Sequence, residues 1–425
     1  MAQKNLIEEF SWRGLVSQTT DREALDRHLE SGQRTVYCGF DPTASSLHIG
    51  SLVPLLALKR FQEFGHRPII LVGGATGLIG DPSGRDSERP LNAEERVMEW
   101  VDSLKEQMSG FLEFQGKSAA TMVNNLPWTE GRDVISFLRD IGKHFSVNAM
   151  IQRDSVKSRL AREGEGISYT EFSYMLLQSM DFLELAKSKE CTIQIGGNDQ
   201  WGNIVSGVDL VRRNMGKEVH ALTLPLVTKS DGTKFGKTAG GSVWLDGNKT
   251  SPYSFYQYWL NVADEDVASF LKYFTFLETD EISGSIDKMN ANPGDRFAQK
   301  LLADSVTELV HGKNAVDSAK RISQILFAGD VRDLSLDDFQ QLELDGLEVA
   351  RIESDAGLLA AMTDAGITKS RGEARNLVKS GGVSVNSISV SDESHLLTRS
   401  DALFNKYQLI RRGKKNFKLL VLENS

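Results

Sequence analysis

The sequence predicts an α/β protein with a doubly wound parallel sheet, followed by a helical domain and a small terminal unit of helices and strands. Its 425 residues suffice for two to three domains with buried cores. In the first half, short β-branched runs alternate with stretches of helical period, which is the pattern of a parallel sheet with crossover helices. After about residue 260 the strand signals fade and amphipathic helices dominate.

The elements can be placed along the chain in order. Strands are expected at 35–41, 68–74, 121–125, 192–197 and 221–228, and helices at 49–64, 92–113, 170–187 and 201–214. Helices at 264–274 and 297–311 belong to the predicted helical domain. We expect domains over 1–225, 226–330 and 353–425, with an acidic linker over 331–352.

Composition narrows the class of protein. Hydrophobic residues make up 40% and charged residues 25% of the chain, as in ordinary globular proteins. There is no secretion signal and no run of about 18 apolar residues, so secretion and membrane insertion are not expected. Cys38 and Cys191 lie far apart without partner ligands, which argues against a disulfide framework or a zinc site and indicates a cytoplasmic location.

Basic residues are concentrated near the C-terminus. The whole chain has 49 Lys and Arg against 58 Asp and Glu, a net charge of −9, whereas residues 351–425 have 12 basic and 8 acidic residues, a net of +4. The overall acidity does not suggest a nucleic-acid-binding protein, but a basic unit can contact phosphates locally. In this unit Arg371, Arg375 and Lys379 follow helical spacing, and Arg411 and Arg412 begin the run RRGKK. This pattern is typical of an RNA-binding face and equally of a solvated helix.

Polar segments follow three of the predicted strands. DPTASSLHIGS (41–51) leads into a helix, where free N–H groups and the helix dipole favour an anion near Thr43 and His48, although an ordinary capped helix would look similar. A glycine-rich loop ends near Asp81, and IGGNDQWGN (195–203) places Asp199 and Gln200 at the start of a helix. Both segments could be turns, but ligands of parallel sheets bind at this edge. A Walker A lysine and GxGxxG are absent.

The helix predicted at 170–187 is apolar nearly all round, which indicates a buried helix. Tyr174, Gln178 and Asp181 nevertheless form one narrow polar stripe along it. Burying an amide and a carboxylate is costly unless both are partnered. The stripe either bonds internal groups or lines a pocket for a polar small molecule. Further on, KFGKT (234–238) places Lys234 and Lys237 in a glycine-flanked loop, which would be solvated or would stabilise a developing pyrophosphate.

Together, HIGS after DPTASSL, the late KFGKT segment and the basic terminal helix resemble the class I aminoacyl-tRNA synthetases. YCGFDPT, GGATGLIGDPSG, FSYMLLQSMDF, IGGNDQWGN and TKSDGTKFGKT are similar to motifs of the bacterial tyrosyl-tRNA synthetases. The resemblance covers essentially the whole chain, including a C-terminal unit similar to an S4 RNA-binding domain. It implies a Rossmann-like catalytic domain.

The resemblance also implies roles for individual residues. Thr43, His48, Lys234 and Lys237 would act on the ATP phosphates as the catalytic residues. The implied tyrosine-binding residues are Tyr37, Asp81, Asn125, Tyr174, Gln178, Asp181 and Gln200. The implied ATP-binding residues are Cys38, Asp41, Thr43, His48, Gly50, Ser51, Gly197, Asp199, Lys234, Lys237 and Thr238. RNA would contact Arg371, Arg375, Lys379, Arg411 and Arg412. The family's second signature histidine is replaced by Ser51, and KFGKT lacks the Met and Ser of the usual motif.

By resemblance, the protein would be a homodimeric enzyme that activates L-tyrosine with ATP and Mg²⁺ and transfers it to tRNA(Tyr). No tightly bound cofactor and no metal held by protein ligands is expected. Two alternatives remain: a related enzyme for another amino acid such as tryptophan, and a non-catalytic RNA-binding protein that keeps the fold. The Tyr37 and Asp181 pair disfavours the first, and the retention of His48, Lys234 and Lys237 disfavours the second.

Overall fold

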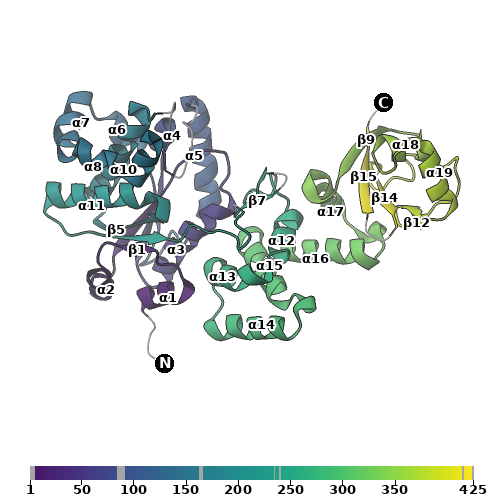
Figure 1. Ribbon diagram of the computed structural model, residues 1–425, viewed down its shortest axis with the longest axis horizontal. Coiled ribbons are helices and arrows are strands. Elements are labelled where there is room, and N and C mark those ends of the chain that lie inside the picture. Colours follow the sequence, from purple (N-terminus) through teal and green to yellow (C-terminus); the bar gives the residue numbers. More distant parts are fainter. Residues whose placement is uncertain are drawn as a thin grey trace. The chain divides into compact units, whose positions relative to one another are not determined.

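The computed structural model describes residues 5–83, 91–161, 166–233, 235–238, 241–413 and 416–423. The chain forms two compact units, which are 1–242 with 269–276, and 243–268 with 277–425. Figure 1 shows the elements of each unit in the colours of the sequence. Within the described ranges, no helix is both long and apolar enough to cross a membrane.

The first unit is built on a six-stranded sheet with the order β1-β6-β5-β2-β3-β4. Its strands are β1 (Gln18–Thr19), β2 (Thr35–Phe40), β3 (Arg67–Val72), β4 (Thr121–Asn124), β5 (Cys191–Gly197) and β6 (His220–Leu224). All neighbours are parallel except β1, which pairs antiparallel with β6. The doubly wound sheet and its five predicted strands are confirmed, and β1 is an addition. The strand order reverses between β2 and β5, where such sheets bind ligands.

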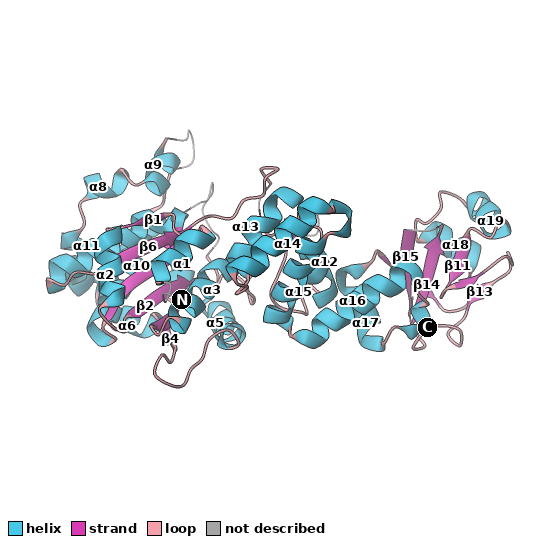
Figure 2. Cartoon of the chain, turned by 90° about the horizontal axis from the view of Figure 1, so that it is seen from below, coloured by secondary structure: helices cyan, strands magenta, loops and turns pink. Residues whose placement is uncertain are grey.

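Helices connect the parallel strands. They are α3 (Leu52–Glu63), preceded by a 3₁₀ turn (Ile49–Ser51), α5 (Glu94–Ser109), α10 (Tyr169–Ser188) and α11 (Trp201–Met215). Shorter helices are α1 (Leu6–Arg13), α2 (Arg22–Glu30), α4 (Thr76–Ile79), α6 (Leu126–Glu130), α7 (Val134–Asp140), α8 (Val147–Ile151) and α9 (Asp154–Leu160). Figure 2 shows the helices flanking the strands.

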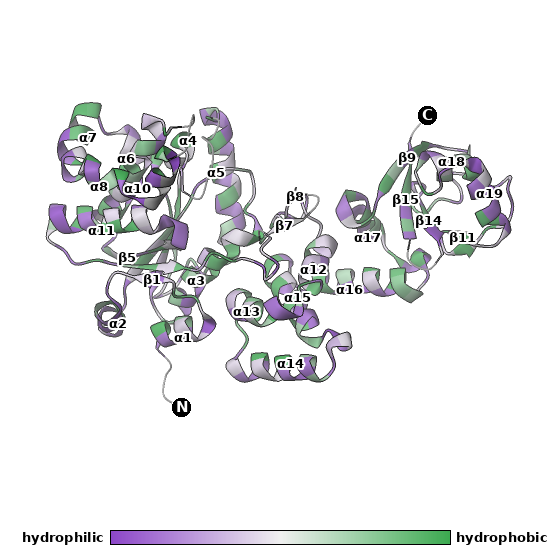
Figure 3. Ribbon diagram, in the orientation of Figure 1, coloured by the Kyte–Doolittle hydropathy of each residue, from purple (hydrophilic) through white to green (hydrophobic). Residues whose placement is uncertain are grey.

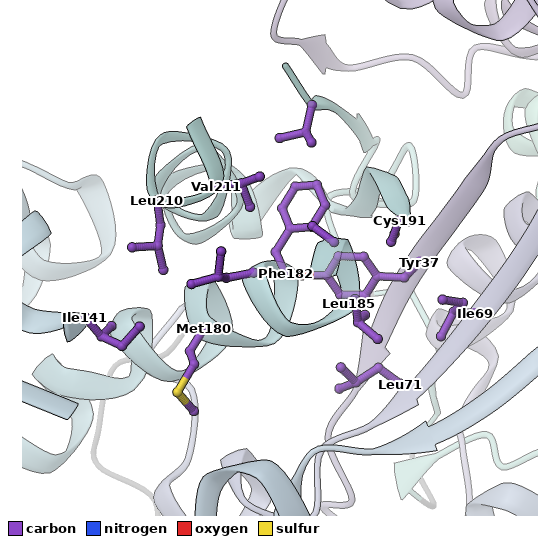
Figure 4. Close-up of a cluster of buried hydrophobic side chains, with 13 residues drawn as sticks. Tyr37, Ile69, Leu71, Ile141, Met180, Phe182, Leu185, Cys191, Leu210 and Val211 are labelled. Carbon is purple, nitrogen blue, oxygen red and sulfur yellow. The ribbon is translucent and has the colours of Figure 1, made fainter. Parts of the chain in front are cut away.

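Helices α10 and α11 cover one face of the sheet. Tyr37 and Leu71 project from β2 and β3 into a buried cluster with Phe182 of α10 and Leu210 of α11 (Figure 4). The rings of Tyr37 and Phe182 lie 5.3 Å apart. Because burying one such side chain contributes about 1.5–3 kcal/mol, this cluster holds α10 against the sheet. Side chains alternate along β2, so Val36 faces the opposite side, where α3 packs.

The second unit begins with helices, which confirms the predicted helical region. They are α12 (Pro252–Leu260), the first part of α13 (Asp264–Phe274), α14 (Thr279–Ala291), α15 (Phe297–His311) and α16 (Lys313–Ala328). Helix α13 from Ser269 onward belongs to the first unit.

A five-stranded sheet follows, with the order β12-β11-β14-β15-β9. Its strands are β9 (Val349–Glu353), β11 (Val383–Val385), β12 (Ile388–Ser389), β14 (Tyr407–Arg412) and β15 (Asn416–Glu423), and a separate pair is β10 (Ala356–Gly357) with β13 (Leu396–Leu397). Strands β9 and β15 are parallel and the other pairs of this sheet are antiparallel. Helices α18 (Leu358–Asp364) and α19 (Arg371–Lys379) pack with this sheet in one apolar cluster.

The stretch 331–352, expected to be a linker, is folded in the structure. It contains α17 (Leu336–Gln341), a π-helical turn (Leu342–Gly346) and the start of β9. Phe339 and Leu342 are fully buried in a cluster with Tyr407 and Leu419 of the C-terminal sheet. The acidic residues that suggested a linker cap this segment instead, because Asp338 forms a capping box with Ser335 and an ion pair with Arg321. The other boundaries, at 225 and 330, stay predictions.

Candidate active site

A cavity of about 430 Å³ opens at the carboxyl ends of β2 and β5, where the strand order reverses. It gathers most of the residues singled out from the sequence. Its walls include Tyr37, Cys38, Asp41, Thr43, His48, Gly50, Ser51, Asp81, Tyr174, Gln178, Asp181, Gly197, Asp199 and Gln200. Residues from four separate chain segments therefore meet in one place, as expected for the carboxyl edge of a parallel sheet.

Asp181 lies at the closed end of the cavity and is held by two donors. Asn125 Nδ2 donates to Asp181 Oδ2 at 3.0 Å, and Trp128 Nε1 donates to Asp181 Oδ1 at 2.9 Å. Burial raises the pKa of Asp181 to about 7, while the hydrogen bonds from Asn125 and Trp128 oppose the shift. Asn125 therefore contacts the Asp181 carboxylate but is not itself part of the cavity wall.

Three buried polar atoms in this region lack a hydrogen-bond partner among the described residues. They are the Tyr37 hydroxyl, Gln178 Oε1 and Gln194 Oε1. Tyr37 is 1% exposed, and this burial raises the pKa of its phenol. The nearby negative charge of Asp181 raises the pKa of the phenol further. Leaving such groups dry and unpaired costs about 1–3 kcal/mol each. A polar ligand in the cavity would remove this cost.

Asp41 joins the strand exit to α10. Tyr174 donates its hydroxyl to Asp41 Oδ2 at 2.7 Å, and Thr76 donates to Asp41 Oδ1 at 2.6 Å. A side chain at Gly73 could not be accommodated, since its Cβ would lie 2.0 Å from Asp41 Oδ1 and 2.2 Å from Thr76 Oγ1. The glycine-rich loop therefore has a steric reason: its backbone must approach the end of β2 closely.

A second carboxylate, Asp81, is linked to the segment after β5. Gln200 Nε2 donates to Asp81 Oδ2 at 2.5 Å, and the backbone N–H of Ser83 donates to Asp81 Oδ1 at 2.9 Å. Asn203 in turn donates to Gln200 Oε1 at 3.2 Å. Burial, followed by the nearby charge of Asp81, raises the pKa of Asp199. With Asp41, Asp81 and Asp199 on its walls, the cavity favours a cationic group such as an ammonium.

His48 precedes the 3₁₀ turn that opens α3. Its Nδ1 accepts the backbone N–H of Gly50 at 3.0 Å. Burial and then the positive charge of Lys237 lower the pKa of His48, so the ring is neutral at pH 7. A neutral ring that accepts at Nδ1 carries its proton on Nε2 and can donate from there.

The KFGKT segment lies against HIGS. Gly236 has φ +79°, and a Cβ there would come within 3.1 Å of Ile49 Cγ1. The ring of Phe235 stacks on Phe274 of α13 with 5.2 Å between centroids, and it also meets Phe270 at 5.1 Å. Lys237 and Thr238 form β7, which pairs with β8 (Gly241–Ser242). Lys234 lies outside the described residues, as does the side chain of Thr238.

The two cysteines are buried thiols, and the described residues hold no cluster of metal ligands. Cys38 and Cys191 are free and buried, and burial raises the pKa of each thiol to about 12, so neither provides a thiolate at pH 7. Among the described residues, no group of His, Cys, Asp and Glu is arranged to hold a metal ion.

The five predicted RNA-contacting residues do not behave alike. Arg375 and Lys379 both pair with Glu393, and Arg412 donates to Glu373 and to the carbonyl of Ile367. The guanidinium of Arg411 lies over the ring of Phe417, 5.2 Å from its centroid. For Arg371 no ion pair is found within the described part of the chain. Hydrophilic residues dominate α19 in Figure 3.

Three residues of the cavity region were not predicted from the sequence, namely Thr76, Trp128 and Gln194. Trp128 follows Asn125 by one helical turn, but its contact with Asp181 spans 53 positions of the chain. Gln194 is a polar residue in the middle of a buried strand, and this was the one local signal that could have drawn attention to it.

A doubly wound sheet whose switch-point cavity is bordered by HIGS and KFGKT is the architecture of the class I aminoacyl-tRNA synthetases. Residues 30–328 match the model of the class I tRNA synthetases for tryptophan and tyrosine, and residues 338–420 match the C-terminal domain of the tyrosine–tRNA ligase SYY-like family. The second match begins inside α17, in agreement with the folding of that helix onto the terminal sheet.

Relatives that match over the whole chain are enzymes for tyrosine and not for tryptophan. The tyrosine–tRNA ligase of Aliivibrio fischeri is 55% identical over 422 residues, with 99% of both chains covered. That of Citrobacter koseri is 54% identical, with 99% of this chain and 98% of the relative covered. A C-terminally truncated mitochondrial tyrosyl-tRNA synthetase of Aspergillus nidulans superposes with a TM-score of 0.70 at 31% identity, over 76% of this chain and 95% of that one. The chain belongs to the tyrosine–tRNA ligase family.

Proposed function

We propose that this protein activates L-tyrosine with ATP and transfers the tyrosyl group to the 3′ end of tRNA(Tyr). The observation that carries the proposal is the pair formed by the unpartnered Tyr37 hydroxyl and the Asp181 carboxylate at the closed end of the cavity. A substrate phenol would accept from one and donate to the other. Tryptophan offers no oxygen there, and phenylalanine would leave the Tyr37 hydroxyl unpaired and would give the Asp181 carboxylate no further donor.

The remainder of the amino acid would be held by the middle of the cavity. We assign its ammonium group to Asp81, Tyr174 and Gln178, since the Gln178 carbonyl oxygen has no partner within the described residues and Asp81 is buried. Gln200, which bonds Asp81, would approach the carboxylate of the amino acid. Asn125 would act through Asp181, since it orients that carboxylate.

ATP would occupy the region between the HIGS turn and the start of α11. Thr43 and His48 line the same cavity, and the Nε2–H of the neutral His48 ring suits a phosphate oxygen. Gly197 and Cys38 line the same cavity, and a Cβ at Gly197 would lie 2.5 Å from Asp199 Oδ1. We assign the ribose to this part of the cavity, beside Asp199. Gly50, Ser51, Asp41 and Thr238 complete the assigned ATP contacts. Mg²⁺ would arrive with the ATP phosphates.

The reaction needs no nucleophilic side chain. A tyrosine carboxylate oxygen attacks the α-phosphorus in line, the bond to the bridging oxygen of the β-phosphate breaks, and pyrophosphate leaves. Lys237, with Lys234 and His48, would stabilise the negative charge that develops on the phosphates. A hydroxyl of the terminal adenosine then attacks the tyrosyl carbonyl, and AMP leaves. Positioning and fixed charge account for both steps.

Amino-acid-dependent pyrophosphate exchange, measured with each of the twenty amino acids, tests the proposal directly. Tyrosine alone should support exchange, and tRNA(Tyr) should then accept the tyrosyl group. Exchange driven by tryptophan would transfer the assignment to the related enzyme. The absence of exchange with every amino acid would favour a non-catalytic RNA-binding role.

We further propose that the protein is a homodimer that uses the surface of α7 and α8. Val134, Ile135 and Leu138 of α7 and Val147 of α8 are exposed apolar residues, with Val134 and Ile135 about 70% exposed. Phe137 faces the other way, into the core. Contiguous apolar surface of this kind is typical of an interface, and a two-fold dimer buries the same patch twice. The two buried free thiols suit a reducing cytoplasm, which is the location we propose.

Ile135→Asp tests the dimer by sedimentation velocity. The wild-type chain should sediment as a dimer and the variant as a monomer, because one carboxylate per protomer would be buried without a partner. Ile388→Asp, at an equally apolar position that is 56% exposed in the second unit, is the matched control and should remain dimeric. A monomeric wild type at micromolar concentration would contradict the assignment.

A further inference from the structure

One carboxylate bridges two of the cations on α19. Glu393 lies in the loop between β12 and β13. Its Oε2 is 2.8 Å from Arg375 Nε, and its Oε1 is 2.9 Å from Lys379 Nζ. Arg375 and Lys379 are one helical turn apart, so both oxygens of the carboxylate are used.

The loop presents Glu393 in a defined position. Asp392 Oδ1 accepts from the backbone N–H of Ser394 at 2.8 Å and from its hydroxyl at 2.7 Å, which closes the turn around Glu393. The backbone N–H of Leu358 donates to the carbonyl of His395 at 2.9 Å and ties the loop to α18. The hydrogen bond from Lys379, with the charges of both cations, holds the pKa of Glu393 below its usual value, so it is ionised at pH 7.

The pairing is open to solvent and can be exchanged. The side chains of Arg375 and Lys379 are 55% and 60% exposed, and that of Glu393 is 36% exposed. Exposed ion pairs of this kind contribute little to folding stability, typically about 0–1 kcal/mol. The contact therefore influences what else can bind the two cations more than it stabilises the domain. Arg412 differs, since it also donates to the carbonyl of Ile367 and so helps to hold α19 to the rest of the unit.

We propose that Glu393 competes with RNA phosphate for Arg375 and Lys379: it occupies both cations in the free protein, and RNA must displace it to bind there. This inference rests on the proposed RNA-binding role of α19. A phosphate that reaches the two cations must break the contacts to Glu393 and then stay near its negative charge. Glu393 thereby lowers the affinity for any polyanion and reduces the local charge from +2 to +1.

The test is the affinity of full-length protein for a tRNA(Tyr) transcript, measured across a range of salt concentrations. Glu393→Gln keeps the shape and removes the charge, so RNA binding should tighten about five-fold at low salt. The slope of log K against log salt should steepen by about 0.7–0.9, because one more phosphate is effectively neutralised. Glu393→Ala should act in the same direction. Asp364→Asn, which removes an exposed charge at the end of α18, is the matched control and should change neither quantity appreciably.

A double-mutant comparison separates competition from a general effect of charge. In an Arg375→Gln, Lys379→Gln background, Glu393→Gln should shift the affinity by less than about two-fold, since nothing remains for the carboxylate to occupy. An equal gain in both backgrounds, or weaker binding by Glu393→Gln and Glu393→Ala alone, would overturn the inference. If neutralising Arg375 and Lys379 does not weaken RNA binding, the RNA-binding role of α19 itself fails. If that change does weaken binding and Glu393→Gln does not tighten it, only the competition fails. Thermal unfolding of each variant confirms that it is folded.

Discussion

The cavity in the first unit and the exposed face of α19 treat their polar groups in opposite ways. In the cavity, the Tyr37 hydroxyl and Gln178 Oε1 are buried without a hydrogen-bond partner among the described residues. On α19, Arg375 and Lys379 are exposed and already paired with Glu393. A ligand with matching hydrogen-bond groups can therefore pair directly with the groups in the cavity. A ligand of α19 must first displace the Glu393 side chain. The first arrangement gives selectivity, and the second gives adjustable, salt-dependent binding.

The largest effect is expected from Asp181→Ala. The change removes the anionic acceptor of the substrate phenol and leaves the donors Asn125 and Trp128 without their partner. In pyrophosphate exchange, kcat/KM for tyrosine should fall by a factor equivalent to on the order of 4 kcal/mol in activation free energy. Activation of phenylalanine should fall much less, because that substrate never used the carboxylate. Asp209→Ala, on the exposed side of α11, serves as the control. A parallel loss for both amino acids would mean that Asp181 supports the fold and does not read the phenol.

Lys237→Ala should have the next largest effect, and it tests a cation that is used for chemistry. Its charge is needed mainly while negative charge develops on the departing pyrophosphate. The activation free energy for adenylate formation should therefore rise by about 3 kcal/mol, which lowers kcat, while the KM for tyrosine stays nearly constant. Rapid-quench measurement of the adenylate checks this expectation. Lys217→Ala, an exposed lysine after α11, should leave kcat unchanged. A raised tyrosine KM with normal kcat would place Lys237 in a binding role.

A change of pH sharpens the contrast between the two regions. Because the pKa of Asp181 is raised to about 7, mainly by burial, the carboxylate becomes protonated as the pH falls through 7. The anionic acceptor is then lost, and kcat/KM for tyrosine should fall about ten-fold between pH 8 and pH 6. Binding of RNA to α19 should stay nearly constant over this range, since Glu393 has a lowered pKa and remains ionised. A flat profile for tyrosine would show that Asp181 is ionised throughout.

The smallest effect is expected from Tyr37→Phe. The variant loses one of two partners for the phenol and keeps the charged one, so the preference for tyrosine over phenylalanine should drop by about 1 kcal/mol. Removing the Tyr37 hydroxyl also eliminates a buried group that has no hydrogen-bond partner among the described residues, so the Tm should stay the same or rise slightly. A large loss of stability would indicate that this hydroxyl is satisfied within the protein.

Much of the fold could be predicted from local patterns because its strands are short apolar runs between turns. β2, β3, β5 and β6 begin within one residue of where they were expected, and each ends at the expected residue or up to four residues before it. β1 was missed because two residues paired antiparallel at an edge leave no periodic signal. Helices α6 to α9 are also short, with only five to seven residues each, so their periodic signal is weak. The misread linker shows the same limit, since Asp338 is balanced by Arg321 on another helix.

Site residues could be predicted from the sequence where several of them lie on one helix and differ in polarity from its other residues. Tyr174, Gln178 and Asp181 stand out on α10 because the rest of that helix is apolar. Trp128 and Glu393 gave no such signal, because each acquires its role from a partner on a different element. The roles assigned to all the site residues, Lys234 and Thr238 among them, stay predictions.

The two buried cysteines have a practical consequence for studying this protein. Cys38 and Cys191 are 2% and 1% exposed, and both thiols stay protonated. Alkylating reagents act on exposed thiolates, so the folded native chain should remain unlabelled by a maleimide probe. A cysteine introduced at an exposed position such as Ser380, just after α19, would then carry a fluorophore without prior removal of the native thiols. The unmodified sequence is therefore already a suitable background for single-site spectroscopy of RNA binding.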